Sequence, residues 1–161
     1  MAKNTIKFNS YSNIQHEYTA TAVAIYPGYL LEETSAGLVQ AHSTAGGPVF
    51  PLVALEDELQ GKDYTTVYAV STKINCWVPT RGDRGYLMLK DGESVAIGDF
   101  VESAGSGLVA KYVADTESLG ADSSANINTF YDHQIVAKVI AAKDLSASAN
   151  TANGLVEVEF I

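Results

Sequence analysis

The chain has 161 residues, of which 47% are hydrophobic and only 18% are charged, and its formal net charge is −9. This length fits a single domain with a packed core, and the composition is not that of a disordered chain. The acidic charge disfavours nucleic acid and membrane surfaces as partners, because both repel negative charge.

The first segment differs in character from the remainder. Residues 1–18 are polar and show no periodicity, and Lys3 and Lys7 are the only charged residues before Glu17. We therefore predict an extended N-terminal arm over residues 1–18. A cationic arm could bind an acidic protein surface, although two lysines near a terminus are equally compatible with no function.

From residue 19 onward, short apolar stretches alternate with turn residues. Between residues 85 and 109 a glycine recurs every few positions, where paired strands must reverse. Many short strands of this kind predict an all-β domain over residues 19–161, a small barrel or sandwich of the jelly-roll or β-tulip type. In chain order the expected strands are 21–26, 29–32, 38–42, 49–55, 64–70, 74–78, three between 85 and 113, 135–140 (or the start of a helix) and 155–161.

Two stretches interrupt this pattern. Residues 56–63 are charged and predict one helical turn or a loop. Residues 115–130 are rich in serine, alanine, aspartate and asparagine, which predicts a surface excursion. No apolar stretch is long enough to span a bilayer, and residues 1–11 lack the apolar core of a signal peptide, so we expect synthesis in a cytoplasm.

Candidate catalytic and cofactor motifs are weak. Residues 105–110 match the letters G-x-G-x-x-A, but a strand-like stretch follows, and dinucleotide binding needs a helix N-terminus there; a hairpin turn is the better interpretation. Asp132 and His133 suggest a hydrolase that uses a serine, yet neighbouring residues on a strand face opposite sides and no G-x-S-x-G elbow is present. We predict no catalytic residue and no enzyme activity.

Metal and disulfide chemistry has equally little support. Cys76 is the only cysteine, so no intramolecular disulfide can form, and its apolar neighbours predict burial. The three histidines are far apart, and the acidic residues near 115–122 lack EF-hand spacing. We expect neither a metal nor a cofactor.

One cluster is typical of a protein interface. Arg81 and Arg84, the only arginines, lie close to Trp77, the only tryptophan, and these residue types dominate binding hot spots. Core packing of Trp77 with solvated arginines is an equal alternative. Together with the arm, the expected interface residues are Lys3, Ile6, Lys7, Phe8, Tyr11, Trp77, Arg81 and Arg84.

Four segments resemble the capsid cement or decoration proteins of tailed bacteriophages. They are residues 23–28, residues 38–39 with 45–47 after them, residues 91–103, and residues 135–146 followed by a short final strand. Their order and spacing carry the resemblance, which spans most of the chain after residue 20. Residues 115–130 have no counterpart in that family.

The resemblance implies a non-enzymatic structural protein on the outer surface of a phage head. Such proteins bridge neighbouring subunits of the major capsid protein, and they form homo-oligomers, with a trimer favoured over a dimer. The N-terminal arm would contact the major capsid protein. An alternative is a carbohydrate- or host-surface-binding module displayed on the virion, in which Tyr26, Tyr29 or Tyr86 would stack on sugars.

Overall fold

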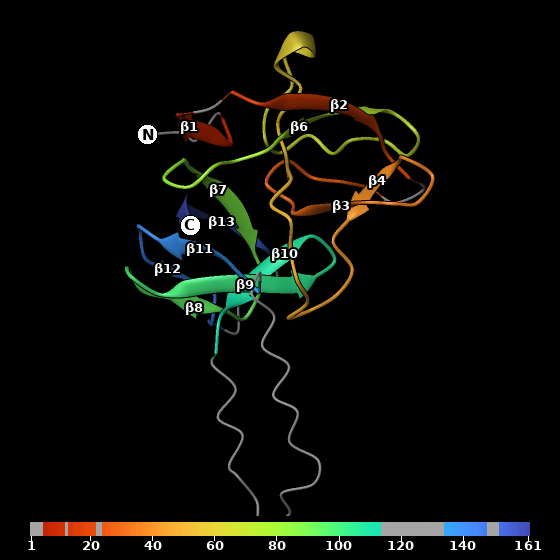
Figure 1. The fold of residues 1–161 in the computed structure, drawn as a ribbon. Helices are drawn as coiled ribbons and strands as arrows, with labels where there is room; N and C mark the ends of the chain where they lie inside the picture. Colours follow the sequence, from red (N-terminus) through yellow and green to blue (C-terminus); the bar gives the residue numbers. More distant parts are fainter. Residues whose placement is uncertain (1–4, 12, 22–23, 114–133, 148–151) are drawn as a thin grey trace, which may run out of the picture.

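The computed structural model describes residues 5–11, 13–21, 24–113, 134–147 and 152–161. Short strands dominate these residues, and one 3-10 turn, η1 (Glu58–Gln60), projects from one end of the molecule (Figure 1). No described helix is long and apolar enough to cross a bilayer. The strands are β1 (Lys7–Asn9), β2 (Gln15–Thr19), β3 (Leu31–Glu33), β4 (Val39–Ala41), β5 (Val53–Ala54), β6 (Lys73–Trp77), β7 (Arg84–Leu89), β8 (Ser94–Val95), β9 (Phe100–Gly105), β10 (Leu108–Lys111), β11 (Ile135–Val139), β12 (Lys143–Asp144) and β13 (Gly154–Phe160).

Five strands close into a barrel. The largest sheet has the order β1-β7-β10-β9-β11-β13, and β13 also pairs with β7, which joins the two sides of the sheet. β1 adds to the outside of this ring by pairing with β7. The prediction of a small all-β barrel is therefore confirmed.

Buried and partly exposed side chains alternate along β7 and β13, which explains why these strands lie in the barrel. Along β13, Val156, Val158 and Phe160 face the core, while the glutamates between them lie partly exposed. A strand with this period of two buries one face and solvates the other.

The turn from β9 to β10 has φ values of 76°, 54° and 76° at Gly105, Ser106 and Gly107, so the G-x-G motif forms the predicted hairpin.

β8 and β12 pair with each other, and Val95 of β8 packs in the first core. Strands β2 to β6 surround a second core. β2, β6 and β5 form one sheet and β3 pairs with β4. Isolated bridges from Leu30 to Val53 and from Ala20 to Val39 connect these two groups. The second core includes Leu31, Leu52, Ile74 and Cys76, and Cys76 is buried as predicted.

The described part of residues 1–18 is not a separate arm. β1 pairs with β7 and β2 pairs with β6. Ile6 is fully buried in the first core, and its N–H donates to the buried Glu56 carboxylate at 3.0 Å. The segment is polar on average, but burial of the Ile6 side chain and strand pairing hold it to the domain.

A predicted strand over residues 64–70 is also wrong. Only Tyr68 forms a bridge, to Ile25, and residues before it turn. The Asp63 carboxylate accepts hydrogen bonds from the Thr65 N–H, the Thr65 hydroxyl and the Thr66 hydroxyl at 3.0, 2.6 and 3.3 Å. These local bonds compete with strand pairing despite the β-branched composition.

The excursion predicted at 115–130 and the Asp132–His133 pair lie outside the described residues.

Candidate functional site

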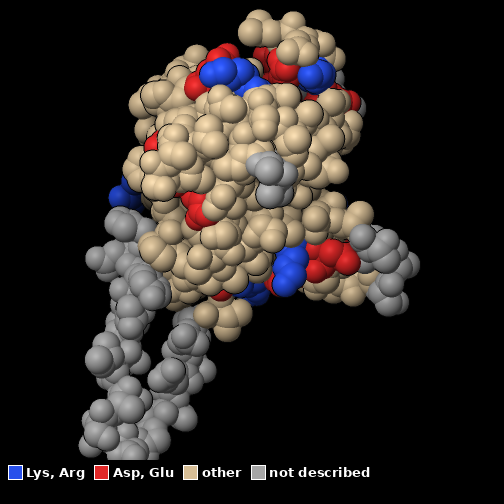
Figure 2. Space-filling view, turned by 90° about the vertical axis from the view of Figure 1, so that its right-hand side faces the viewer, with Lys and Arg blue, Asp and Glu red and all other residues tan. Residues whose placement is uncertain are grey.

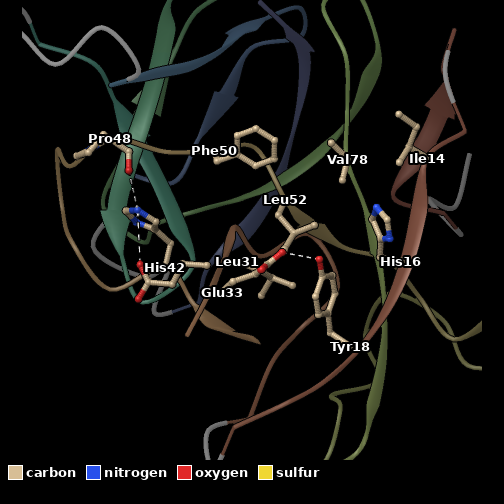
Figure 3. Close-up of a pocket in the computed structure, with 11 residues that line it drawn as sticks. Ile14, His16, Tyr18, Leu31, Glu33, His42, Pro48, Phe50, Leu52 and Val78 are labelled. Atoms are coloured by element: carbon tan, nitrogen blue, oxygen red, sulfur yellow. Dashed lines mark hydrogen bonds and ion pairs between the residues drawn. The ribbon is translucent and has the colours of Figure 1, made fainter. Parts of the chain in front are cut away.

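An open hollow of about 620 Å³ lies over the second core, between β2 and the segment around β3 (Figure 3). This volume is within the range of ligand pockets, which occur in the mouths of β-barrels. Residues from five separate parts of the chain line it: Ile14, His16, Tyr18, Leu31, Glu32, Glu33, His42, Pro48, Phe50, Leu52 and Val78.

The floor and walls of the hollow are largely apolar. Leu31 and Leu52, which belong to the second core, form its floor. On the walls, Phe50 is 77% exposed and Ile14 is 45% exposed. Apolar side chains with this exposure around a concavity are typical of a surface that another molecule covers.

Acidic groups lie at the rim. The Tyr18 hydroxyl donates a hydrogen bond to the Glu33 carboxylate across the hollow (Figure 3). This bond, with burial and the Glu33 charge, raises the pKa of Tyr18 to about 12. No described lysine or arginine lies within ion-pair distance of Glu33, and none lines the hollow. The rim therefore carries negative charge without a cation beside it.

A buried serine–histidine pair adjoins the hollow. His42 Nε2 lies 3.2 Å from the Pro48 carbonyl oxygen, so this nitrogen carries the proton, and the Ser103 hydroxyl donates to Nδ1 at 2.8 Å. Ser103 is only 1% exposed, and its oxygen also accepts the Gly105 N–H at 3.2 Å. A nucleophile must reach its substrate, so this geometry joins the segment after β4 to β9 and does not form a catalytic pair.

Glu32 extends this network at the rim. Its carboxylate lies 3.8 Å from His42 Nε2 and accepts a hydrogen bond from Gln40 at 2.6 Å. Burial opposes the charge on Glu32, but hydrogen bonds from Gln40 and Ser43, together with the electrostatic interaction with the nearby His42 ring, lower its pKa. Glu32 is thus held ionised at the edge of the hollow.

Five of the predicted interface residues lie on or beside β1 and β7. We call Lys7, Phe8, Tyr11, Arg81 and Arg84 the β1 patch. Three contacts hold this region in place: the Asn9–Arg84 register pair, the Phe8 and Tyr86 rings with centroids 5.1 Å apart, and the Tyr11 ring over Gly82. Lys7 and Phe8 are neighbours on β1, so their side chains face opposite sides of that strand.

The side chains of the β1 patch differ in their exposure to solvent and in whether they already have a partner within the chain. Tyr11 is 80% exposed and Phe8 is 43% exposed. Arg84 forms an ion pair with Glu159 at 2.7 Å, and Lys7 Nζ donates to Asn13. Arg81 is exposed at the turn before β7.

Three predicted interface residues do not lie in the patch. Ile6 and Trp77 are fully buried in the first core, so neither contributes directly to a surface, and for Trp77 core packing is the alternative that holds. Lys3 lies outside the described residues.

Two of the three tyrosines named for sugar binding lie together. The Tyr26 and Tyr29 rings have centroids 5.5 Å apart beside a smaller hollow of about 300 Å³, which Met88, Ala152 and Asn153 complete. Tyr86 is not among its lining residues, because its ring packs on Phe8 and its hydroxyl donates to Glu157 at 2.9 Å.

The large hollow was not predicted from the sequence. Its residues come from segments up to 64 positions apart, so no short motif contains them. The low charge of the chain indicated a covered surface but gave no position for it. On the face drawn in Figure 2, charged side chains are sparse over the middle. Among the described residues, no group of three or more His, Cys, Asp or Glu is placed to hold a metal ion.

Comparison with known proteins finds a likeness of structure and none of sequence. No protein-family model matches the chain, and no curated protein matches it in sequence. Among solved structures, the base of the head fiber gp8.5 of bacteriophage phi29 is similar, with a TM-score of 0.51 and 9% sequence identity. The match covers 92% of this chain and 95% of that one. At this identity the likeness shows a shared fold.

Proposed function

We propose that this protein is a structural component of a phage head, which binds the outside of the shell and bridges neighbouring subunits of the major capsid protein. The observation that carries the proposal is the match to the head fiber base, which extends over nearly the whole length of both chains. The resemblance of four sequence segments to cement proteins supports it independently.

The surface of the barrel suits such a role. Tyr11, Phe8 and Arg81 of the β1 patch are exposed, and aromatic and arginine side chains supply most of the binding energy in protein interfaces. We propose that the β1 patch faces the major capsid protein. Each contact can be modest, because many copies act together on one shell.

Assembly belongs to the same proposal. We propose that the protein is a homo-oligomer on the outer surface of the virion, with a trimer favoured over a dimer. A closed ring of copies would present several β1 patches at once, which raises avidity without strengthening any single contact. Equilibrium sedimentation of the purified protein measures the number of copies directly.

A binding assay on intact heads tests the proposed function. The purified chain is mixed with heads of the phage that encodes it, and the bound fraction is measured after sedimentation. We expect saturable binding that the double variant Tyr11→Ala with Arg81→Ala weakens roughly tenfold or more. The control Leu59→Ala changes a 94% exposed residue at η1 and should bind normally. Absence of binding by the unaltered protein would refute the proposal.

Sugar binding is a second candidate, favoured by the Tyr26–Tyr29 pair beside its hollow. Aromatic rings beside a concavity can stack on the apolar face of a sugar ring. A glycan array probed with the unaltered protein and with Tyr26→Ala tests this candidate. Binding that depends on Tyr26 would support it, and an array without signal would exclude it for the glycans presented.

A further inference from the structure

We infer that the large hollow and the adjoining edge of β2 form a docking site for an extended segment of another protein, with an apolar side chain flanked by lysine or arginine. This segment would add to β2 as a strand and insert its apolar side chain between Phe50 and the floor. The inference deepens the proposed function, on which it rests for the setting in which the partner is met.

The first argument is the open edge of β2. β2 is the outer strand of its sheet, whose order is β2-β6-β5. The Val78 N–H donates to the Ile14 carbonyl at 3.0 Å, so the main-chain groups of Ile14 face β6. Main-chain groups of an antiparallel strand alternate in direction, so those of Gln15 and Glu17 face away from β6. No described strand pairs with that edge at either residue.

The second argument is the position of the hollow beside that edge. His16 and Tyr18 on β2, and Ile14 just before it, alternate with the residues just named, and all three line the hollow (Figure 3). A strand added to β2 would present every second side chain to the same side of the sheet. Main-chain pairing combined with a side-chain pocket is a recurrent mode of peptide recognition.

The third argument is charge. Glu32 and Glu33 lie at the rim, and no lysine or arginine is among the lining residues. Glu17, on the open edge, forms an ion pair at 3.5 Å with Lys73, and both side chains are exposed. A partner with a cationic side chain beside its apolar anchor matches this arrangement, whereas an acidic segment would be repelled.

Peptide titration followed by NMR tests the inference. The probe is acetyl-Lys-Val-Phe-Val-Lys-amide, added to the isotope-labelled full chain. We expect amide shift changes at residues 14–18, 31–33 and 50–52. Replacing both lysines of the probe by glutamate should weaken binding by about tenfold or more. N-methylation of the alternate main-chain nitrogens that face β2 should abolish it, because those groups can no longer donate.

Matched variants identify the site. Phe50→Ser, at an exposed wall position, should abolish binding of the lysine peptide, whereas Leu59→Ser, at an exposed position outside the hollow, should leave it unchanged. Glu33→Gln should weaken binding and Glu58→Gln should not. The dispersion of each variant's own amide spectrum shows that it is folded.

Several outcomes would overturn the inference. These are no shift changes with the lysine peptide, equal binding of the glutamate peptide, unchanged binding by Phe50→Ser, or shifts at the hollow with methyl glycosides alone. Self-association that Phe50→Ser abolishes would also overturn it, since the occupant would then be a second copy. If the unaltered protein binds heads but no peptide, this inference fails while the proposed function stands; if it binds the peptide but no heads, the proposed function fails.

Discussion

Trp77 and Phe160 pack edge to face, with ring centroids 5.4 Å apart and planes at 81°. Trp77 is the last residue of β6 and Phe160 the last residue of β13, so this contact joins the sheet over the second core to the strand that closes the barrel. The Trp77 ring also covers Gly85, where a Cβ atom would lie 2.8 Å from Cζ3. Both rings belong to the first core, while β6 also contributes Ile74 and Cys76 to the second core. We therefore expect the two cores to unfold together.

Truncating either ring should therefore destabilise the whole domain. We expect Phe160→Ala to lower the free energy of unfolding by about 3–5 kcal/mol, because a buried aromatic side chain leaves a cavity. A double-mutant cycle with Trp77→Leu should give a coupling of about 0.5–1.5 kcal/mol for the ring pair. Urea unfolding measures both values. Two separate transitions in the unaltered protein would contradict the joint folding of the cores.

Ile6 should contribute to stability as a core residue. Ile6→Ala is expected to cost about 2–5 kcal/mol, since its side chain is fully buried. Phe8→Ala is the matched control, because Phe8 is 43% exposed, and it should cost about 1 kcal/mol or less. The comparison uses the free energy of unfolding in urea. Equal small losses for both variants would mean that the segment before β1 is not part of the domain.

Gly107 is the position where the β9–β10 hairpin should tolerate no side chain. A Cβ atom there would lie 2.6 Å from Tyr29 Cδ2, and φ is 76°. Gly92 has a φ of 87°, but a Cβ atom added there would have no other atom within 4 Å. An alanine at Gly92 therefore measures the cost of the positive φ alone, without a steric clash. We expect Gly92→Ala to lose about 1–2 kcal/mol and Gly107→Ala clearly more. Equal losses, measured by thermal unfolding, would show that the contact with Tyr29 is not tight.

Cys76 should be unreactive in the folded protein. Burial, and then the Glu33 charge, raise the pKa of its thiol from 9.0 to about 12. Because the folded pKa lies above the unfolded one, the stabilising contribution is complete below pH 9 and is lost as the pH rises towards 12. Iodoacetamide should label Cys76 at pH 8 only in urea concentrations that unfold the domain. Rapid labelling without urea would contradict its burial.

The sequence predicts the elements that depend on neighbouring residues better than the contacts between residues that are far apart in the chain. The glycine spacing around Gly105 and the alternation leading to Phe160 are local, and both predicted their elements correctly. The side-chain bonds of Asp63 are also local, but strand composition concealed them.

Long-range contacts were beyond these patterns. Ile6 is one apolar residue in a polar segment, and its burial depends on β7 and Glu56, which lie far along the chain. The hollow combines Ile14, Phe50 and Val78, whose proximity follows only from the sheet topology. The β1 patch consists of residues that were chosen by type, as residue types typical of hot spots, and its role as an interface stays a prediction.

Electron cryomicroscopy of the phage head would show whether the protein bridges capsid subunits. We expect density on the outer surface of the shell into which the β-barrel fits as a rigid body, in contact with at least two neighbouring subunits of the major capsid protein. Density that contacts only one subunit would contradict bridging. Heads that carry no such density, while the protein is abundant elsewhere in the infected cell, would contradict the head-bound role itself.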